Sequence, residues 1–151
     1  MNFALSQGDN KMRATIFEKI VEKKGSVPTL IHPSANVSKY AQLGRGVVVH
    51  MNTVVHPDVT VGDNTVLSYN VSVTHSTHIG KNCYLAFGVM LGAYTIVEDF
   101  VFIGIGAIVI SGKVDSIGTF ASVGAGAVVT KSVASYECVA GNPAKFIKTL
   151  K

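Results

Sequence analysis

Charged residues, cysteine and tryptophan are scarce in this sequence. Only 15% of the 151 residues are charged, tryptophan is absent, and there are two cysteines. Cys83 and Cys138 form neither a CxxC pair nor a disulfide framework, which fits a reducing cytosol, so we expect a cytoplasmic protein. Apolar residues make up 48% of the chain. That fraction and the low charge both argue against disorder, and the length indicates one folded domain.

Long apolar runs and targeting signals are also missing. The apolar runs are broken by Gly, Ser or Asp within about ten residues, which is too short to span a bilayer. Met1 is followed by neither a basic region nor an apolar stretch ending in small residues. We therefore expect no secretory signal and no membrane partner.

The basic residues are unevenly distributed. The net charge is +4 and the isoelectric point is near 9.1. Lys and Arg gather at the two ends, with almost none between Arg45 and Lys81, and no basic stripe is interleaved with aromatics. This distribution argues against a nucleic-acid partner. A small phosphorylated ligand near the C-terminus explains the charge as well as solubility alone does.

The sequence does contain a six-residue repeat, which runs from residue 31 to residue 134. One column of the repeat is aliphatic, the next is often glycine, and the fifth is mostly small or β-branched. Glycines in the second column indicate tight backbone approach or unusual φ. The register slips by two residues around 113–116. The aliphatic column is Ile31, Val37, Leu43, Val49, Val55, Val61, Leu67, Val73, Ile79, Leu85, Leu91, Val97, Ile103, Val109, Ile117, Val123 and Val129.

A period of six predicts an all-β parallel β-helix. Neither a helix nor an ordinary strand repeats every six residues, whereas a solenoid with one flat face and one tight corner per row does. Three rows close one triangular coil, so the rows of this repeat predict five to six coils. Neighbouring coils pair as parallel strands around an aliphatic interior. The slip is then a small corner bulge, and Cys83, in the small column, is a buried structural thiol.

The two ends of the chain lie outside the repeat. We expect residues 1–30 to form a strand–helix fragment, 31–134 the β-helix, and 135–151 a tail that caps the last coil or folds back over it. Residues 8–10 supply a turn and an N-cap, and the helix ends at residues 23–25 with Gly25 in the C′ position. The apolar face of this helix is predicted to comprise Met12, Ile16, Phe17, Ile20 and Val21.

One of the five histidines stands out by its column. His75 occupies the third column and therefore a corner, with Pro57 and Ala93 stacked one coil away on either side, which leaves room around the imidazole. Imidazole is the side chain best suited to exchange a proton near neutral pH, so His75 is a candidate general base. The other histidines, His32, His50, His56 and His78, fit surface or inter-subunit hydrogen bonding.

Other kinds of catalytic site find little support. A zinc site needs three converging ligands, but His75 and His78 sit on different sides of a turn and the other histidines lie coils away, so no metal is expected. The sequence has no Gly-x-Ser-x-Gly elbow, P-loop or Rossmann fingerprint. Paired carboxylates for hydrolysis are also missing.

The repeat and several ordered motifs resemble a known family. The six-residue register is typical of left-handed parallel β-helix acyltransferases. The motifs resemble those of the sugar acetyltransferases that modify nucleotide-linked amino sugars or sialic acid, over essentially the whole chain. This resemblance implies left-handed coils, a homotrimer, and acetyl-CoA as co-substrate. The motifs are residues 8–13 (GDNKMR), 30–35 (LIHPSA), His75 with 78–80 (HIG), 123–131 (VGAGAVVTK) and 141–145 (GNPAK).

The resemblance also implies roles for individual residues. His75 takes the proton of the acceptor amine or hydroxyl, and backbone N–H groups near Gly92 and Ala93 stabilise the oxyanion. Ser76, Ser68 and Asn70 are expected to orient or support the base. The residues expected to contact acetyl-CoA are Tyr84, Gly104, Ile105, Gly124, Ala125, Lys131, Asn142, Pro143 and Lys145.

Three departures from the family pattern stand out. The family has Asp or Glu directly after the histidine, where this chain has Ser76, and a serine cannot stabilise an imidazolium by charge. A second histidine of some members aligns with Tyr84. Relatives also carry an upstream βαβ domain that grips the nucleotide, and residues 1–30 resemble its last strand and helix.

These observations lead to one prediction and two alternatives. The predicted function is acetyl-CoA-dependent N-acetylation of a nucleotide-linked amino sugar by a homotrimer, with His75 as the base. The first alternative is O-acetylation of a sugar hydroxyl by the same base. The second is a non-catalytic trimeric solenoid that serves as a scaffold. The sequence does not identify the sugar.

Overall fold

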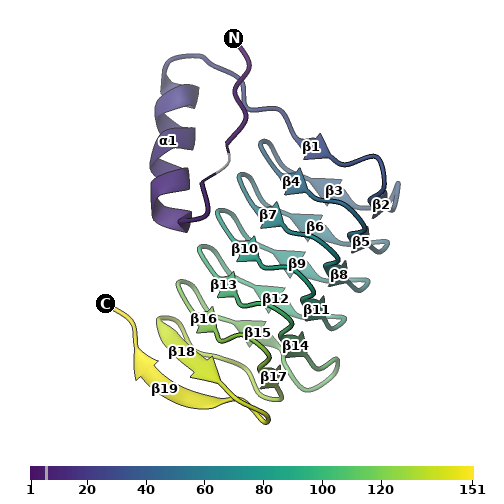
Figure 1. Cartoon of the computed structure of the whole chain (residues 1–151), viewed down its shortest axis with the longest axis vertical. Helices are drawn as coiled ribbons and strands as arrows, with labels where there is room; N and C mark the ends of the chain where they lie inside the picture. The colour runs from purple at the N-terminus through teal and green to yellow at the C-terminus, as the bar shows by residue number, and fades with distance from the viewer. Residues whose placement is uncertain (6) are drawn as a thin grey trace.

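The computed structural model describes residues 1–5 and 7–151 and shows a triangular solenoid with one helix along its side (Figure 1). Face 1 contains β1 (Leu30–Ile31), β4 (Val48–Val49), β7 (Val66–Leu67), β10 (Tyr84–Leu85), β13 (Phe102–Ile103), β16 (Ser122–Val123), β18 (Glu137–Ala140) and β19 (Lys145–Thr149). Face 2 contains β2 (Asn36–Val37), β5 (Val54–Val55), β8 (Ser72–Val73), β11 (Met90–Leu91), β14 (Ile108–Val109) and β17 (Val128–Val129). Face 3 contains β3 (Gln42–Leu43), β6 (Thr60–Val61), β9 (His78–Ile79), β12 (Ile96–Val97) and β15 (Ser116–Ile117).

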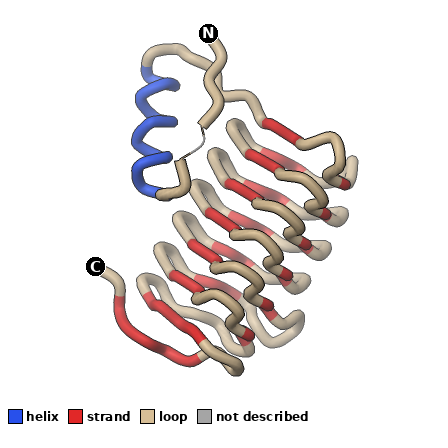
Figure 2. The backbone as a smooth tube through the Cα atoms, in the orientation of Figure 1, coloured by secondary structure: helices blue, strands red, loops and turns tan. Residues whose placement is uncertain are grey.

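The stacking of the coils follows the predicted register. Strands of one face pair in parallel with a shift of three rows, as in Val48 with Val66. Across the slip the shift also includes the two extra residues, as in Ile108 with Val128. The chain winds through about six turns of a left-handed parallel β-helix, so the predicted fold class is confirmed. Short strands alternate with tight turns throughout the solenoid (Figure 2).

The interior of the prism is the aliphatic column. Leu67, Ile79 and Leu85 are fully buried, and each stacks on the equivalent residue of the neighbouring coil. The hydroxyls of buried threonines in the fifth column donate to backbone carbonyl oxygens, as Thr65 does to Gly80. Cys83 is buried as predicted, and its burial raises the pKa of the thiol to about 12. We therefore assign the Cys83 side chain a packing role in the core.

The corners depend on a column that the sequence reading overlooked. The fourth residue of most rows adopts a left-handed backbone conformation, with φ near 57° at Asn52 and 65° at Gly106. The glycines of the second column do not adopt positive φ. They are needed because the coils approach closely: a Cβ on Gly62 would lie 2.7 Å from the carbonyl carbon of Gly80. Of the two explanations offered for these glycines, close approach between coils is therefore correct and unusual φ is not.

Helix α1 (Asn10–Glu22) begins as predicted but buries a different face. The Asp9 carboxylate accepts a hydrogen bond from the Met12 N–H at 2.7 Å, which caps the helix N-terminus. The buried residues are Arg13, Ala14 and Phe17, whereas Met12 is 54% exposed. The predicted apolar face is thus buried at Phe17, half-buried at Ile16 and Ile20, and wrong for Met12 and Val21. Arg13 joins the contact because backbone carbonyls of the prism accept its guanidinium hydrogens.

The end of the helix also corrects a detail. Lys24, with φ of 58°, takes the left-handed position that was expected for Gly25. Gly25 is constrained by space instead, since a Cβ there would lie 2.6 Å from a methyl carbon of Ile20. The expected N-terminal strand reduces to one bridge between Asn2 and Ser26. Among the described residues, no helix has the length and apolarity needed to cross a membrane.

The slip falls slightly before the expected residues 113–116, and the tail forms a hairpin. The two extra residues form a turn over residues 111–113, at the corner between β14 and β15. After the last coil, β18 pairs in parallel with β16, and β19 folds back antiparallel to β18. The C-terminal hairpin thus extends face 1, and its turn contains the Asn142–Pro143 bond.

Candidate active site

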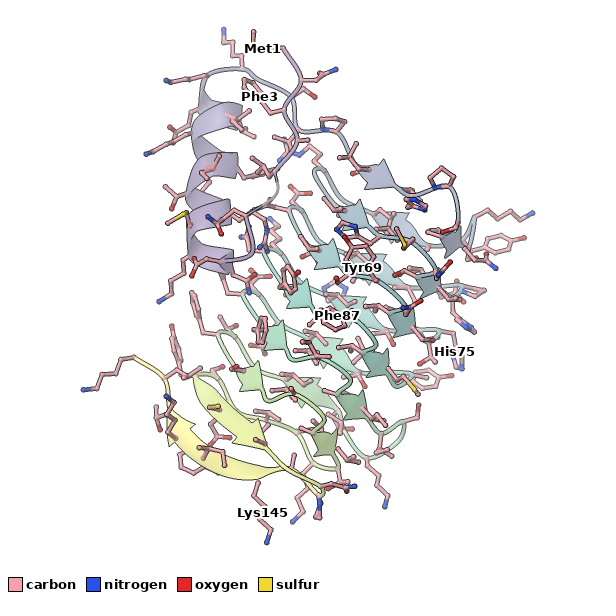
Figure 3. All side chains as sticks on the ribbon, viewed as in Figure 1. Met1, Phe3, Tyr69, His75, Phe87 and Lys145 are labelled. Carbon is pink, nitrogen blue, oxygen red and sulfur yellow. The ribbon has the colours of Figure 1, made fainter. Side chains whose placement is uncertain are left out.

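His75 lies on an outer corner of the prism. It is exposed and sits in the turn between β8 and β9, which joins face 2 to face 3; this edge is called corner 2–3 (Figure 3). The preceding coil contributes Pro57, whose carbonyl accepts the Ser76 N–H at 3.3 Å. The equivalent residues of the following coils are Ala93 and then Ser111. Because each coil repeats the same path, these side chains stand in one line along the corner.

Two groups contact the imidazole of His75. The hydroxyl of Ser76 lies 3.3 Å from Nδ1. The ring of Tyr94 lies 5.3 Å from the imidazole, centroid to centroid, with the two planes at 88°. When Nδ1–H donates to the Ser76 oxygen, Nε2 carries the lone pair and is free to accept a proton. The sequence reading missed Tyr94. The sequence did contain a signal, because Tyr94 is an aromatic residue in the fourth column of the repeat, where Asn and Gly are common.

The backbone N–H of Ala93 is already occupied in this structure. It donates to the hydroxyl oxygen of Ser111 at 2.7 Å, while the N–H of Gly92 donates to the Val109 carbonyl at 3.0 Å. Ala93 is buried, with 7% of its surface exposed. An oxyanion that binds the Ala93 N–H therefore has to displace Ser111 or bind beside it.

Three other predicted residues lie away from His75, on face 1 and on the corner between faces 1 and 2 (corner 1–2). Ser68 and Tyr84 line a hollow of about 420 Å³ between face 1 and the N-terminal segment, and Asn70 lies in the adjoining turn. His50 and Tyr69, which were not predicted as site residues, line the same hollow with ring centroids 4.6 Å apart. Burial, with His32 nearby as a second cause, lowers the pKa of His50.

The residues predicted to follow the pantetheine arm also lie at corner 1–2. Gly104, Ile105, Gly124 and Ala125 occupy two stacked turns of this corner, where a Cβ on Gly104 would lie 2.6 Å from the Ala125 nitrogen. Ile105 is 44% exposed. Figure 3 shows Tyr69 and Phe87 of corner 1–2 on a different part of the prism from His75. One chain therefore does not bring His75 and these residues together.

The basic residues near the C-terminus form a third group. Lys131 and Lys145 line a hollow of about 270 Å³ beside the C-terminal hairpin. Asn142 and Pro143 lie in the turn between β18 and β19. Lys131 belongs to the same corner as His75, further toward the C-terminal end. The two lysines suit an anionic group such as a phosphate, and Glu137 lines the same hollow.

Two of the remaining histidines have local partners. The Nδ1 of His32 lies 2.9 Å from the hydroxyl of Ser34, and His78 contacts the hydroxyl of Thr60 on face 3. In the part of the chain that the structure describes, no group of three or more His, Cys, Asp or Glu side chains is arranged to hold a metal ion.

Comparison with known proteins agrees with this architecture. Residues 40–75 match the family model described as "Bacterial transferase hexapeptide (six repeats)". The chain is 33% identical to a GDP-perosamine N-acetyltransferase, PerB from Caulobacter crescentus, whose structure holds CoA and GDP-perosamine. That alignment covers 97% of this chain and 70% of the other, with a TM-score of 0.94. The chain belongs to the left-handed β-helix acyltransferases built from hexapeptide repeats.

Two further structures resemble this acyltransferase. The acetyltransferase domain of PglB from Neisseria gonorrhoeae, in complex with acetyl coenzyme A, is 29% identical, with a TM-score of 0.92 over 97% of this chain and 70% of that one. WeeI from Acinetobacter baumannii is 25% identical, with a TM-score of 0.93 and the same coverage. None of the curated proteins compared by sequence matches the acyltransferase significantly.

Proposed function

We propose that the protein transfers the acetyl group of acetyl-CoA to the amino group of a nucleotide-linked sugar, with His75 as the general base. The observation that carries the proposal is the exposed corner histidine, whose Nδ1 lies 3.3 Å from the Ser76 hydroxyl. With the proton on Nδ1, Nε2 is the basic nitrogen. Related structures with CoA and GDP-perosamine, or with acetyl coenzyme A, support the choice of substrates.

The chemistry requires one group that accepts a proton and one hydrogen-bond donor that stabilises the oxyanion. The sugar amine attacks the thioester carbon while Nε2 of His75 takes a proton from the nitrogen. Negative charge develops on the carbonyl oxygen, which would be stabilised either by the Ser111 hydroxyl or by the Ala93 N–H once the Ser111 oxygen is displaced. The tetrahedral intermediate collapses, the C–S bond breaks, and the CoA thiolate leaves with the proton from His75. The products are the amide and CoA.

A homotrimer would complete the site. Exposed apolar residues stack along corner 1–2: Met51, Tyr69, Phe87 and Ile105 are 40–47% exposed. We place this ridge against corner 2–3 of a neighbouring copy, which directs face 2 and its exposed Met90 toward the trimer axis. The glycine-lined turns of one copy then meet His75 of the next. Acetyl-CoA would extend along this junction, with its phosphates toward Lys131 and Lys145.

The test compares His75→Ala with His78→Ala in an assay of CoA release from acetyl-CoA and GDP-perosamine. Loss of the base should lower kcat by about 10²–10⁴-fold, whereas the His78 variant, changed three residues away on face 3, should keep the wild-type rate. A His75→Ala enzyme with wild-type kcat would refute the assignment of the base. A sugar that offers only hydroxyl groups, assayed in parallel, separates N-acetylation from O-acetylation.

The scaffold alternative predicts no binding of acetyl-CoA. A ligand that binds only the folded protein at 100 times its Kd stabilises it by about 2.7 kcal/mol, which a thermal melt detects readily. A melting temperature that does not change with saturating acetyl-CoA would therefore favour the scaffold over the enzyme.

A further inference from the structure

Tyr94 occupies an unfavourable backbone position beside the candidate base. Its φ is 60°, in the left-handed region, where bulky residues are rare because their Cβ crowds the backbone. The other left-handed residues on corner 2–3 are Asp58, Ser76 and Gly112, which are smaller. Backbone strain of this kind persists where the surrounding structure or the function requires the side chain.

Burial in the chain does not explain the tyrosine. Tyr94 is 69% exposed, so its ring contributes little to the hydrophobic core. The contact it does make is with His75, at 5.3 Å between ring centroids and with nearly perpendicular planes. Edge-to-face packing of this kind is favourable for aromatic pairs. The structure therefore places an aromatic ring where a turn residue would be favoured, and aims it at the imidazole.

We propose that Tyr94 is a positioning residue that holds the imidazole of His75 in its reactive orientation. This proposal rests on the proposed function of His75. Ser76 binds Nδ1 from one side, but a single hydrogen bond at 3.3 Å leaves the exposed ring free to rotate. The perpendicular ring of Tyr94 removes that freedom, and Nε2 then faces the acceptor. In this chain a serine and an aromatic ring together take over the orienting role that the family resemblance assigns to a carboxylate.

The test uses the fact that the left-handed turn at residue 94 favours a small residue, whereas the proposed role requires an aromatic ring. Tyr94→Asn suits the left-handed turn and removes the ring, so its melting temperature should rise while kcat falls about tenfold. The KM for acetyl-CoA should change by less than about twofold, since the ring acts on the base rather than on the co-substrate. Tyr94→Phe keeps the ring and should retain kcat within about twofold.

Three outcomes would overturn the proposal. The first is wild-type kcat in Tyr94→Asn, which would assign the residue to the turn alone. The second is an equal loss in Tyr94→Phe and Tyr94→Asn, which would assign the effect to the phenol hydroxyl. The third is a raised KM at unchanged kcat, which would make Tyr94 a substrate contact. The matched control is Phe120→Asn, which changes an aromatic residue of the same backbone conformation, φ 59°, on another corner and should leave kcat unchanged.

A second measurement does not depend on activity. The ring current of Tyr94 should displace the proton NMR signals of the His75 imidazole in the wild type and in Tyr94→Phe, and the displacement should vanish in Tyr94→Asn. Unchanged His75 signals in Tyr94→Asn would refute the contact. If the wild-type protein transfers no acetyl group, the proposed function fails on that result alone, while the NMR comparison still decides whether Tyr94 orients His75.

Discussion

The Nη2 atom of Arg13 lies 3.0 Å from the carbonyl oxygen of Cys83, so helix α1 is joined to the solenoid by a buried arginine. Arg13 is 1% exposed. Its Nε donates to the Asn64 carbonyl at 3.0 Å, and Nη2 also donates to the Asn82 carbonyl at 3.2 Å. One side chain thus satisfies turn carbonyls of two neighbouring coils. Burial is the largest influence on the guanidinium and lowers its pKa.

We expect Arg13→Met to destabilise the protein by about 2–4 kcal/mol, because it leaves buried carbonyls without donors. The measurement is chemical denaturation monitored by circular dichroism. Lys19→Met is the matched control on the same helix, since Lys19 is exposed and should change the free energy of unfolding by less than about 0.5 kcal/mol. Equal stability of the Arg13 and Lys19 variants would show that the arginine contacts contribute nothing.

The apolar ridge at corner 1–2 predicts which substitution prevents the trimer from forming. Phe87 is 47% exposed in the single chain, and Phe87→Glu would place an unpaired carboxylate in the proposed interface. Light scattering after gel filtration should show a trimer for the wild type and a monomer for this variant. Ile96→Glu, on face 3 at 50% exposure, is the control and should stay trimeric. A trimeric Phe87→Glu protein would exclude this ridge as the interface.

The hydrogen bond between Ser111 and the Ala93 N–H predicts the effect of a substitution at Ser111. If the N–H itself binds the oxyanion, Ser111→Ala removes a competing acceptor and should raise kcat, by up to about tenfold for one freed hydrogen bond. If the Ser111 hydroxyl is the donor, kcat should fall by a similar factor or more. Steady-state rates of Ser111→Ala decide between the two, with Ser135→Ala as a control beyond the solenoid's last coil.

Asp63 makes the stability of the first coils dependent on pH. Its burial would raise the carboxyl pKa, but hydrogen bonds from the backbone and side chain of Arg45 outweigh that effect and lower it. The Arg45 N–H donates to the carboxylate at 2.8 Å, and the guanidinium forms an ion pair with it at 3.0 Å. Because the folded pKa lies below the unfolded one, the stabilisation is present above the unfolded pKa and disappears as the pH falls through the folded pKa.

We therefore expect Asp63→Asn to lower the free energy of unfolding by about 1 kcal/mol at pH 7, since most of Arg45 is exposed to solvent. The difference between wild type and variant should shrink at acidic pH, below the ordinary pKa of aspartate. Denaturation curves collected across this range measure it. A difference that stays constant with pH would mean that the carboxylate charge plays no part.

The sequence by itself determined the repeating parts of this protein. A six-residue period dictates which side chains enter the prism, and a coil of three rows puts His75 on a corner with Pro57 and Ala93 in line. Such placements follow from counting, because every row repeats the same backbone. The buried thiol of Cys83 could be predicted for the same reason, and so could a corner bulge, although it was expected around 113–116 and lies at 111–113.

Only the tertiary structure decided the contacts that break the repeat. Arg13 is buried because carbonyls from distant coils surround it, which no helical periodicity reveals. Ser111 reaches the Ala93 N–H, and Tyr94 turns its ring onto His75, because side-chain directions depend on the neighbouring coil as well as on the row.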